Sequence, residues 1–426
     1  MDGELILRRL GARKQILLLQ GPGSLFFHRL GGFLHGAGCT VTKVHFNAGD
    51  ALFYRHGNAL AYQGQLHDWP TWLATVMQER GIEAVIMFGD CRHYHRHAIA
   101  VAREQGVGVF VFEEGYVRPG FVTFEADGVN ANSPIPSRFT ANRPSEVSAF
   151  SNRYAPIHMP VVTAAQRWFD FAAMGLQAAA YAVATRFGRN RFPHYQHHKS
   201  IRLGHEVFCW LRSSWRKAVY KLEDAPRRLL LLRRMKQRYF VAPLQVFNDS
   251  QLTHHSSFAD QTAFISAVLH SFAAHARNDK HLVFKHHPMD RGHRYYGGVI
   301  DHLSRELGLR GRVHYLHDVH LPTLFRHALG VITVNSTAGL SALYHGAPVL
   351  CLGRSLYNLP GLTHQGGMDS FWRTAQTPVA TEVLRLRALL REHALVPGSF
   401  YRGAIADSRM AATRVADRVE QGARQS

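Results

Sequence analysis

The stretch GVITVNSTAGLSALYHGAPV, residues 330–349, predicts the fold most directly. Its apolar run Val331–Val334 passes straight into the small polar residues Asn335–Thr337, which indicates a buried strand followed by a capped helix. Backbone N–H groups, the helix dipole and hydroxyl donors then converge at one point, which suits a phosphate. Gly339 would let a ligand or a neighbouring backbone come close. An ordinary capped helix is the alternative interpretation.

Similar strand-length apolar runs occur on both sides of this stretch, separated by helix-length segments. In the second half of the chain they lie at residues 239–245, 281–285, 312–316 and 348–352. In the first half they lie at residues 15–20, 40–46, 84–88 and 108–112. Strands that alternate with helices predict parallel sheets, in which ligands gather at the carboxyl ends of the strands.

The sequence therefore predicts an α/β protein with two Rossmann-like domains. The first is expected over residues 1–150 and the second over residues 241–385. Between them, residues 151–240 are predicted to form a basic helical insertion. Residues 386–426 are predicted to form closing helices.

The composition is strongly basic, with 50 lysines and arginines against 30 acidic residues and a formal net charge of +20. Such a charge indicates nucleic acid, an anionic membrane surface or phosphorylated substrates as partners. Much of the excess lies between residues 186 and 238, where aromatic residues are interleaved. This pattern is typical of a helix at a lipid interface, and a solvated helical linker is the alternative.

No membrane-spanning or secreted segment is predicted. The longest apolar stretch, residues 171–184, is shorter than the roughly 20 residues that a spanning helix needs. The N-terminus lacks a basic region followed by a long apolar run, so no signal peptide is expected. The four cysteines are widely spaced, which predicts free thiols and a reducing, cytoplasmic location.

Two further constellations could carry chemistry. Glu113 and Glu114 end a predicted strand, where neighbouring side chains point to opposite sides, so one carboxylate is expected to meet a ligand. Arg118 follows as a candidate partner for a carboxylate or phosphate, with pairing to a local acid as the alternative. Lys285 and His287-Pro288 follow another strand, and a residue before proline is extended, which can aim an imidazole outward. A salt-bridged strand end and a structural histidine are the alternatives.

Other motifs are missing from the sequence. It contains no phosphate-binding loop of the Gly-Lys-Ser/Thr type, no His-Glu-x-x-His helix and no nucleic-acid-binding module. Histidines at 93, 95 and 97 have no Cys or carboxylate partner at ligand spacing, so no metal site is predicted. We therefore expect neither a metal cofactor nor a nucleic-acid partner.

Several blocks together resemble the bacterial capsule polysaccharide synthesis family, and its KpsS/LipB-type branch in particular. They include Leu19–Phe27, Lys43–Asp50, Phe112–Pro119, Gly128–Ser133, Pro243–Gln251, Lys285–Pro288 and Asn335–Gly339. The resemblance implies a GT-B glycosyltransferase in which two Rossmann-like domains face a cleft. It implies transfer of β-Kdo, a sugar acid, from CMP-Kdo to phosphatidylglycerol or its lyso form, starting the lipid linker of the capsule. It also implies a metal-independent reaction and a peripheral seat on the cytoplasmic face of the inner membrane, where other capsule synthesis and export proteins are possible partners.

The resemblance also implies roles for individual residues. The acid-glycine motif falls on Glu113-Glu114-Gly115, with Glu114, directly before the glycine, as the expected catalytic carboxylate and Glu113 as the alternative. His287 is the second expected catalytic residue. The donor-binding residues implied are Lys285, Pro288, Asn335, Ser336, Thr337, Gly339, Gln245 and Asp249. Because the implied linkage retains configuration, Glu114 is expected to act as a nucleophile, with a general-base role as the alternative. A capsule transferase that uses another nucleotide sugar and a non-catalytic scaffold of the export assembly are the rival functions.

Overall fold

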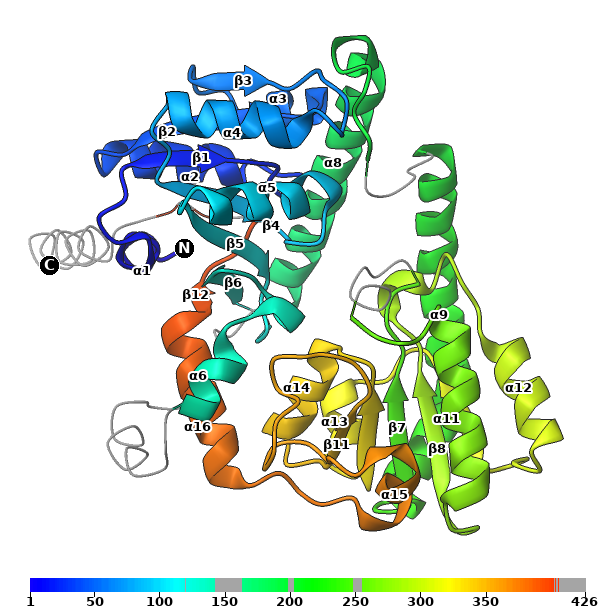
Figure 1. Cartoon of the computed structure of the whole chain (residues 1–426). Helices are drawn as coiled ribbons and strands as arrows, with labels where there is room; N and C mark the ends of the chain where they lie inside the picture. Colours follow the sequence, from blue (N-terminus) through cyan, green and yellow to red (C-terminus); the bar gives the residue numbers. More distant parts are fainter. Residues whose placement is uncertain are drawn as a thin grey trace, which may run out of the picture. The chain divides into compact units, whose positions relative to one another are not determined.

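The computed structural model describes residues 1–118, 120–141, 163–197, 203–247, 255–401, 403 and 405, and these residues form two α/β units. The described part of unit 1 lies in residues 1–129, 163–197 and 390–405 (Figure 1). That of unit 2 lies in residues 130–141 and 203–389. Each unit is built around one sheet and is described by itself.

The sheet of unit 1 has seven strands in the order β12-β6-β5-β4-β1-β2-β3. Its strands are β1 (Gln15–Leu18), β2 (Thr40–His45), β3 (Ala59–Ala61), β4 (Ala84–Phe88), β5 (Gly108–Glu114), β6 (Phe121–Ala126) and β12 (Leu395–Pro397). Strands β3, β2, β1, β4 and β5 are parallel, whereas β6 pairs antiparallel with β5 and β12 antiparallel with β6. Figure 1 shows β12, from the end of the chain, beside β6.

Helices cover both faces of this sheet, because its central strands are apolar on both sides. One face, with Leu18, Ile86 and Phe112, packs against α1 (Gly3–Leu10) and α2 (Phe26–Gly36). The other face, with Leu19, Met87 and Val111, packs against α4 (Trp69–Glu79) and α5 (His93–Glu104). Strands whose side chains are buried on both faces are typical of a parallel sheet between two helical layers. The short α3 (Ala48–Phe53) follows β2.

A long helix from the middle of the chain also belongs to unit 1. Helix α8 (Ala164–Phe187) lies against α3 and continues into η3 (Gly188–Arg191). Side chains of α8 and of the segment after η3 reach the carboxyl ends of β1 and β2, as described below.

The sheet of unit 2 has five parallel strands in the order β11-β10-β7-β8-β9. They are β7 (Tyr239–Pro243), β8 (His281–Lys285), β9 (Val313–Leu316), β10 (Gly330–Thr333) and β11 (Val349–Cys351). The helices and turns of this unit are η1 (Asn130–Asn132), α6 (Ile135–Ala141), α9 (Leu203–Arg234), α11 (Gln261–His275), η4 (Pro288–Asp290), α12 (Gly297–Glu306), α13 (Leu321–Phe325), α14 (Thr337–Tyr344) and α15 (Gly367–Thr374). Helix α16 (Ala380–His393) begins in unit 2 and ends in unit 1.

The core of unit 2 combines β7, β8 and β10 with α11, α12 and α15. Phe240, Phe284 and Ile332 from the strands pack with Phe264 and Trp372 from the helices, and all five are at most 4% exposed. On the opposite face, the Tyr239 hydroxyl donates to the carbonyl of Leu324 in α13 at 2.9 Å.

Helix α9 docks on loops of unit 2 through polar contacts. The carboxylate of Asp224 accepts the N–H groups of His317 and Asp318, both at 2.6 Å, just after β9. The ring of Tyr220 stacks on His317 with 3.8 Å between centroids. Arg216 Nη1 donates to the carbonyl of Arg291 at 3.0 Å. These contacts fix one face of α9 to the carboxyl ends of β8 and β9.

The structure confirms the two predicted α/β regions and their parallel sheets. All the predicted strands are present, and β3, β6 and β12 are additional. Leu395–Pro397, expected to be helical, instead extends the sheet of unit 1 as β12. The segment expected as one insertion is divided, with α8 in unit 1 and α9 in unit 2. Residues 130–141, expected in the first domain, belong to unit 2. An arrangement of the two units around a cleft stays a prediction.

None of the helices in the described ranges combines the length and the apolar character that crossing a bilayer requires. All four cysteines are free, as predicted.

Candidate functional site

The carboxyl ends of the parallel strands in unit 1 bring several polar side chains to one edge of its sheet. Gln20 follows β1, Asn47 follows β2, Arg92 follows β4, and Glu113 and Glu114 end β5. Parallel strands run in the same direction, so these positions meet although they are far apart in sequence. Gln20 and Asn47 are nearly fully buried, whereas Arg92 and the two glutamates are partly exposed.

Glu113 and Glu114 occupy different positions at the end of β5. The backbone N–H of Glu114 donates to Glu113 Oε1 at 2.9 Å, so the Glu113 carboxylate is turned back over the next peptide. The Glu114 carbonyl accepts from the Thr123 hydroxyl of β6 at 3.3 Å. The hydrogen bond occupies one oxygen of the Glu113 carboxylate, and that only one of the two carboxylates meets a ligand stays a prediction.

Gly115 is required directly after the two carboxylates. A side chain at this position would collide with the backbone carbonyl of Phe121, where the chain returns in β6. The backbone cannot move aside without breaking the pairing between β5 and β6, so the acid-glycine motif is fixed by the geometry of this hairpin. Arg118 is exposed and its Nε donates to the carbonyl of Gly115 at 2.9 Å, within the same turn.

The electrostatics of this edge centre on Glu113. Burial raises the pKa of Glu113 to about 7, although the N–H of Glu114 opposes this rise. The charges of Glu114 and Asp90 add to the rise, and the Arg92 guanidinium lowers the pKa. A carboxyl group with a pKa near neutrality can both accept and donate a proton at physiological pH.

A polar network centred on Gln20 lies beside these carboxylates and was not predicted. Gln20 Nε2 lies 2.9 Å from both the Tyr181 and the Tyr195 hydroxyl oxygens. Gln20 Oε1 accepts from Arg92 Nη1 at 3.0 Å. The position of Gln20 after an apolar strand was a local signal, but its tyrosine partners lie more than 150 residues away in the sequence.

In unit 2, the ends of β7 and β10 are joined by two amide side chains. Gln245 Nε2 donates to Asn335 Oδ1 at 3.0 Å, and the Asn335 backbone N–H lies 3.3 Å from Gln245 Oε1. The backbone N–H of Gln245 is itself bound by Gln261 of α11 at 3.1 Å. The structure thus brings together two of the predicted donor-binding residues. A third, Asp249, lies outside the described residues.

Helix α14 begins at the predicted phosphate site. Ser336 is its N-cap, and the Ser336 hydroxyl accepts the N–H of Ala338 at 3.2 Å. Thr337 is the first helical residue, and Asn335, Ser336 and Thr337 are all partly exposed. The strand-to-capped-helix geometry is confirmed; its use for a phosphate stays a prediction.

Gly339 has a side chain, and not the backbone, as its close neighbour; its part in donor binding stays a prediction. A side chain at this position would meet the Tyr357 hydroxyl and lie 2.8 Å from the ring carbon Cζ of Tyr357. The Tyr357 hydroxyl donates to the carbonyl of Ser336 at 2.5 Å. Gly339 therefore makes room for a buried tyrosine that supports the helix start, and the neighbour it admits is a protein side chain.

Lys285 ends β8 and His287 lies two residues further on, and the two side chains have different surroundings. Lys285 is 4% exposed, and its Nζ donates to the carbonyl of His286 at 2.7 Å. Burial lowers the pKa of Lys285 to about 8, as does Arg291, while Asp318 and Asp224 oppose the decrease. His287 is partly exposed and extended, and its Nδ1 accepts the N–H of Met289 at 3.2 Å. Pro288, which begins η4, is exposed. Lys285 can therefore act on a ligand through its charge, whereas the His287 side chain is partly exposed.

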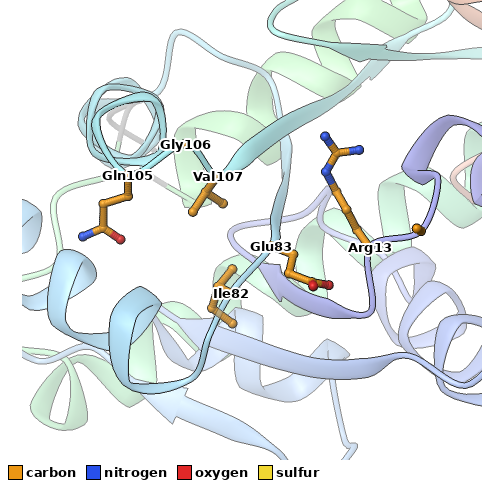
Figure 2. Close-up of a pocket in the computed structure, with 7 residues that line it drawn as sticks. Arg13, Ile82, Glu83, Gln105, Gly106 and Val107 are labelled. Carbon is orange, nitrogen blue, oxygen red and sulfur yellow. The ribbon is translucent and has the colours of Figure 1, made fainter.

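A shallow hollow at the opposite edge of the unit 1 sheet contains none of the predicted site residues. Seven residues line this hollow, and Figure 2 labels six of them: Arg13, Ile82, Glu83, Gln105, Gly106 and Val107. Glu83 accepts the backbone N–H of Gln15 at 3.0 Å, which gives this carboxylate a structural role before β1. The described residues hold no group of three or more His, Cys, Asp or Glu side chains placed to bind a metal.

Comparison with known proteins identifies relatives over most of the chain. Residues 83–401 match the family described as capsule polysaccharide biosynthesis protein. The chain is 38% identical over 390 residues to the capsule polysaccharide export protein KpsS of Escherichia coli. The matched region covers 91% of this chain and 97% of the relative. It is also 38% identical over 379 residues to the capsule polysaccharide modification protein LipB of Neisseria meningitidis serogroup A, which covers 87% of each.

Two solved structures show a distant likeness. One is the KpsC β-Kdo 2,7 transferase of Thermosulfurimonas dismutans, with 15% identity, a TM-score of 0.43 and coverage of 95% of this chain and 99% of that one. The other is the UDP-GlcNAc 2-epimerase of Neisseria meningitidis, with 12% identity, a TM-score of 0.27 and coverage of 95% and 100%. Likeness at this level decides nothing about the reaction of this chain.

The raised pKa of Glu113 predicts a pH-dependent effect of replacing it. The pKa of the Glu113 carboxyl is about 7 in the folded protein and about 4.5 in the unfolded chain. The folded protein therefore loses stability as pH rises between these values. Glu113→Gln removes this loss, so the variant should unfold at a higher temperature than the wild type at pH 8 and at a similar temperature at pH 4. Thermal unfolding followed by circular dichroism from pH 4 to 8 would measure the difference. A constant difference across this range would contradict the assignment.

Proposed function

The chain belongs to the capsule polysaccharide biosynthesis family, and from this premise we propose that it is a glycosyltransferase. The proposed reaction moves β-Kdo from CMP-Kdo to phosphatidylglycerol or lysophosphatidylglycerol, at the start of the lipid linker of a capsule. The observation that carries the proposal is that the family match, residues 83–401, contains both the adjacent carboxylates Glu113 and Glu114 at the end of β5 and the capped start of α14 after β10. Each feature lies at the carboxyl edge of a parallel sheet, where α/β enzymes bind substrates.

CMP is assigned to unit 2. Its phosphate would lie at the start of α14, near the Ser336 and Thr337 hydroxyls, where the helix dipole favours a negative charge. The paired amides of Gln245 and Asn335 hold the backbone before this helix in place. His287 would donate a hydrogen bond to the phosphate as negative charge grows on the departing CMP. The positive charge of the buried Lys285 would stabilise the same developing charge.

Glu114 is assigned as the nucleophile. Its carboxylate would attack the anomeric carbon of Kdo, whose bond to the CMP oxygen breaks, and the electron pair would leave with the phosphate. The acceptor hydroxyl would then attack the glycosyl-enzyme, releasing the Glu114 carboxylate and giving up its proton to a base. Glu113, with a pKa of about 7, fits that second role. Two displacements leave the configuration of the sugar unchanged.

The lipid acceptor calls for contact with a membrane surface, and α9 has a face that suits it. Its most exposed apolar side chains are spaced by 3, 4, 7 and 7 residues, which places them on one side of a helix. They are Phe208, Leu211, Trp215, Leu222 and Leu229, and they are 51–77% exposed. This apolar stripe lies opposite Tyr220 and Asp224, which dock α9 on unit 2.

Other exposed residues of α9 are basic, which favours an anionic lipid surface. Lys217, Lys221, Arg227 and Arg228 of α9 are exposed. Each cation near an anionic leaflet contributes on the order of 1 kcal/mol of attraction. Peripheral association with the inner face of the inner membrane is therefore part of the proposal.

Transfer activity is the first prediction from this function. Incubation with CMP-Kdo and a fluorescent phosphatidylglycerol analogue should yield a glycosylated lipid, separable by chromatography. Glu114→Ala and His287→Ala should each reduce the rate by at least about 100-fold, because each removes a group that acts in the transition state. The exposed residues Glu79 and His302 supply matched controls, Glu79→Ala and His302→Ala, which should keep full activity.

Intact-protein mass spectrometry separates the two roles of Glu114. A nucleophile should give a protein carrying the mass of one Kdo after mixing with CMP-Kdo alone, and Glu114→Gln should give none. Transfer without any such adduct, including in a Glu113→Gln variant slowed in the second step, would assign Glu114 as a general base. Wild-type protein that neither transfers nor cleaves CMP-Kdo would contradict the proposed function.

Binding to vesicles tests the apolar stripe. At low salt the protein should sediment with vesicles that contain phosphatidylglycerol and only weakly with phosphatidylcholine alone. The double variant Leu211→Ser with Leu222→Ser should bind at least about tenfold more weakly, since two buried leucines are lost from the interface. Leu384→Ser, at a 55% exposed leucine on α16, is the control and should bind normally. Equal binding by the double variant would rule out this face.

A further inference from the structure

The side-chain amide of Gln20 has an orientation fixed by its partners. Arg92 can only donate hydrogen bonds, so the atom that it meets at 3.0 Å must be the Gln20 carbonyl oxygen. The amide nitrogen of Gln20 then points to the hydroxyl oxygens of Tyr181 and Tyr195, each at 2.9 Å. Gln20 is 4% exposed, so this buried amide uses its carbonyl and both N–H groups.

The tyrosines that hold Gln20 are themselves held. The Tyr181 hydroxyl donates to Asp50 Oδ1 at 3.0 Å and accepts from Asn47 Nδ2 at 2.7 Å. Asp50 also accepts the backbone N–H of Phe46 at 3.0 Å. The network therefore links α8, α3 and the loops after β1 and β2, and each member is held by at least two others. Such connected buried networks define a single side-chain geometry.

The result of this network is one immobilised guanidinium at the carboxyl edge of unit 1. Arg92 Nη1 donates to Gln20 Oε1 and to the carbonyl of Gly21 at 3.2 Å. The guanidinium also lies over the ring of Phe88, 5.1 Å from its centroid. Within the ranges that the structure describes, Arg92 forms no ion pair, and its Nε and Nη2 have no hydrogen-bond partner. Three of its N–H donors are thus available to a ligand.

The acids nearest to Arg92 have other partners. Asp90 accepts the backbone N–H of Val129 at 3.2 Å and the thiol of Cys91 at 3.2 Å. Glu113 accepts the N–H of Glu114. Asp50 is balanced by Lys43, which is nearly fully buried. The charge of Arg92 is therefore not neutralised by contact with any of these carboxylates.

We propose that Arg92 is the anion-binding residue of unit 1 and takes a carboxylate or phosphate group of a substrate. The inference rests on the proposed function, which offers two sources for this group: the carboxylate of Kdo and the phosphate of the acceptor headgroup. Gln20 and Tyr181 are positioning residues that act through Arg92. A guanidinium held in advance binds a carboxylate or phosphate with two parallel hydrogen bonds and loses little entropy on doing so.

Arg118 was the residue expected from the sequence for this role, and its surroundings are less suitable. It is exposed and bonds only within its own turn, through Nε to the carbonyl of Gly115. An exposed arginine loses side-chain entropy and its hydration when it binds an anion, so the same contact is weaker. Arg118 is therefore the matched control for Arg92.

Isothermal titration of the full chain tests the proposal directly. The probes are free Kdo, its methyl ester as the neutral analogue, and glycerophosphoglycerol, the headgroup phosphodiester without acyl chains. The wild type should bind at least one of the two anions more tightly than the methyl ester. Arg92→Gln should weaken binding of that anion at least about tenfold and leave the methyl ester unchanged, whereas Arg118→Gln should match the wild type.

Two further variants separate binding from folding. Arg92→Lys keeps the charge but loses the planar fork, so it should fold and bind with an intermediate affinity. Tyr181→Phe removes one partner of Gln20 and should weaken binding of the same anion by a smaller factor. The anion whose binding depends on Arg92 identifies the source. Binding of both anions by Arg92→Gln and Arg92→Lys at wild-type affinity would overturn the proposal, as would a wild type that does not prefer either anion to the ester.

Failure of this inference differs from failure of the proposed function. If wild-type protein transfers Kdo and Arg92→Gln has an unchanged KM for both substrates, the function stands and the role of Arg92 is wrong. If no transfer occurs while anion binding still depends on Arg92, the site stands and the reaction is wrong.

Discussion

The arrangement of both candidate sites depends on one constraint, the parallel direction of the strands. Parallel strands must return by a crossover, so all their carboxyl ends come to the same edge of the sheet. In unit 1 this brings together Gln20 and Arg92, from the loops after β1 and β4, and Glu113, at the end of β5. In unit 2 it brings Gln245 of one loop to Asn335 of another. The loops can therefore differ in chemistry while the sheet keeps them in place.

Buried charges at these edges need partners, and the middle of the chain supplies many of them. Tyr181 of α8 bonds Asp50 and the Gln20 amide, and Asp224 of α9 lies near the buried Lys285. A buried polar or charged group without a partner would cost several kcal/mol. The two long helices thus stabilise the edges of the sheets through their inner faces. The outer face of α9 remains apolar and other exposed positions of the helix are basic, so one helix can serve both the fold and a lipid surface.

The sequence predicted the features that local patterns encode. Apolar runs ending in glycine or small polar residues located the main strands, and the cap at Ser336 followed from its position after β10. The short strands β3 and β12 were missed because three residues are too few to show a period. The role of Gly339 was also missed, because the side chain that needs the space, Tyr357, comes from a later loop.

The network around Arg92 shows why the rest of the site could not be predicted. Gln20 and Tyr181 are separated by 161 residues, and Asn47 and Tyr181 by 134. No local period connects such positions, and tyrosines in a helix are usually core residues. Only the fold brings them together, and only the distances show that they converge on one arginine.

The central claim is that substrates bind at the carboxyl edges of the two sheets. Hydrogen–deuterium exchange of the full chain with and without CMP tests it most directly for the nucleotide. The account predicts slower exchange in residues 333–340 and 283–290 when CMP is bound, and unchanged exchange around Glu83 and Gln105 at the opposite edge of unit 1. Protection confined to that opposite edge, or no protection at saturating CMP, would contradict it.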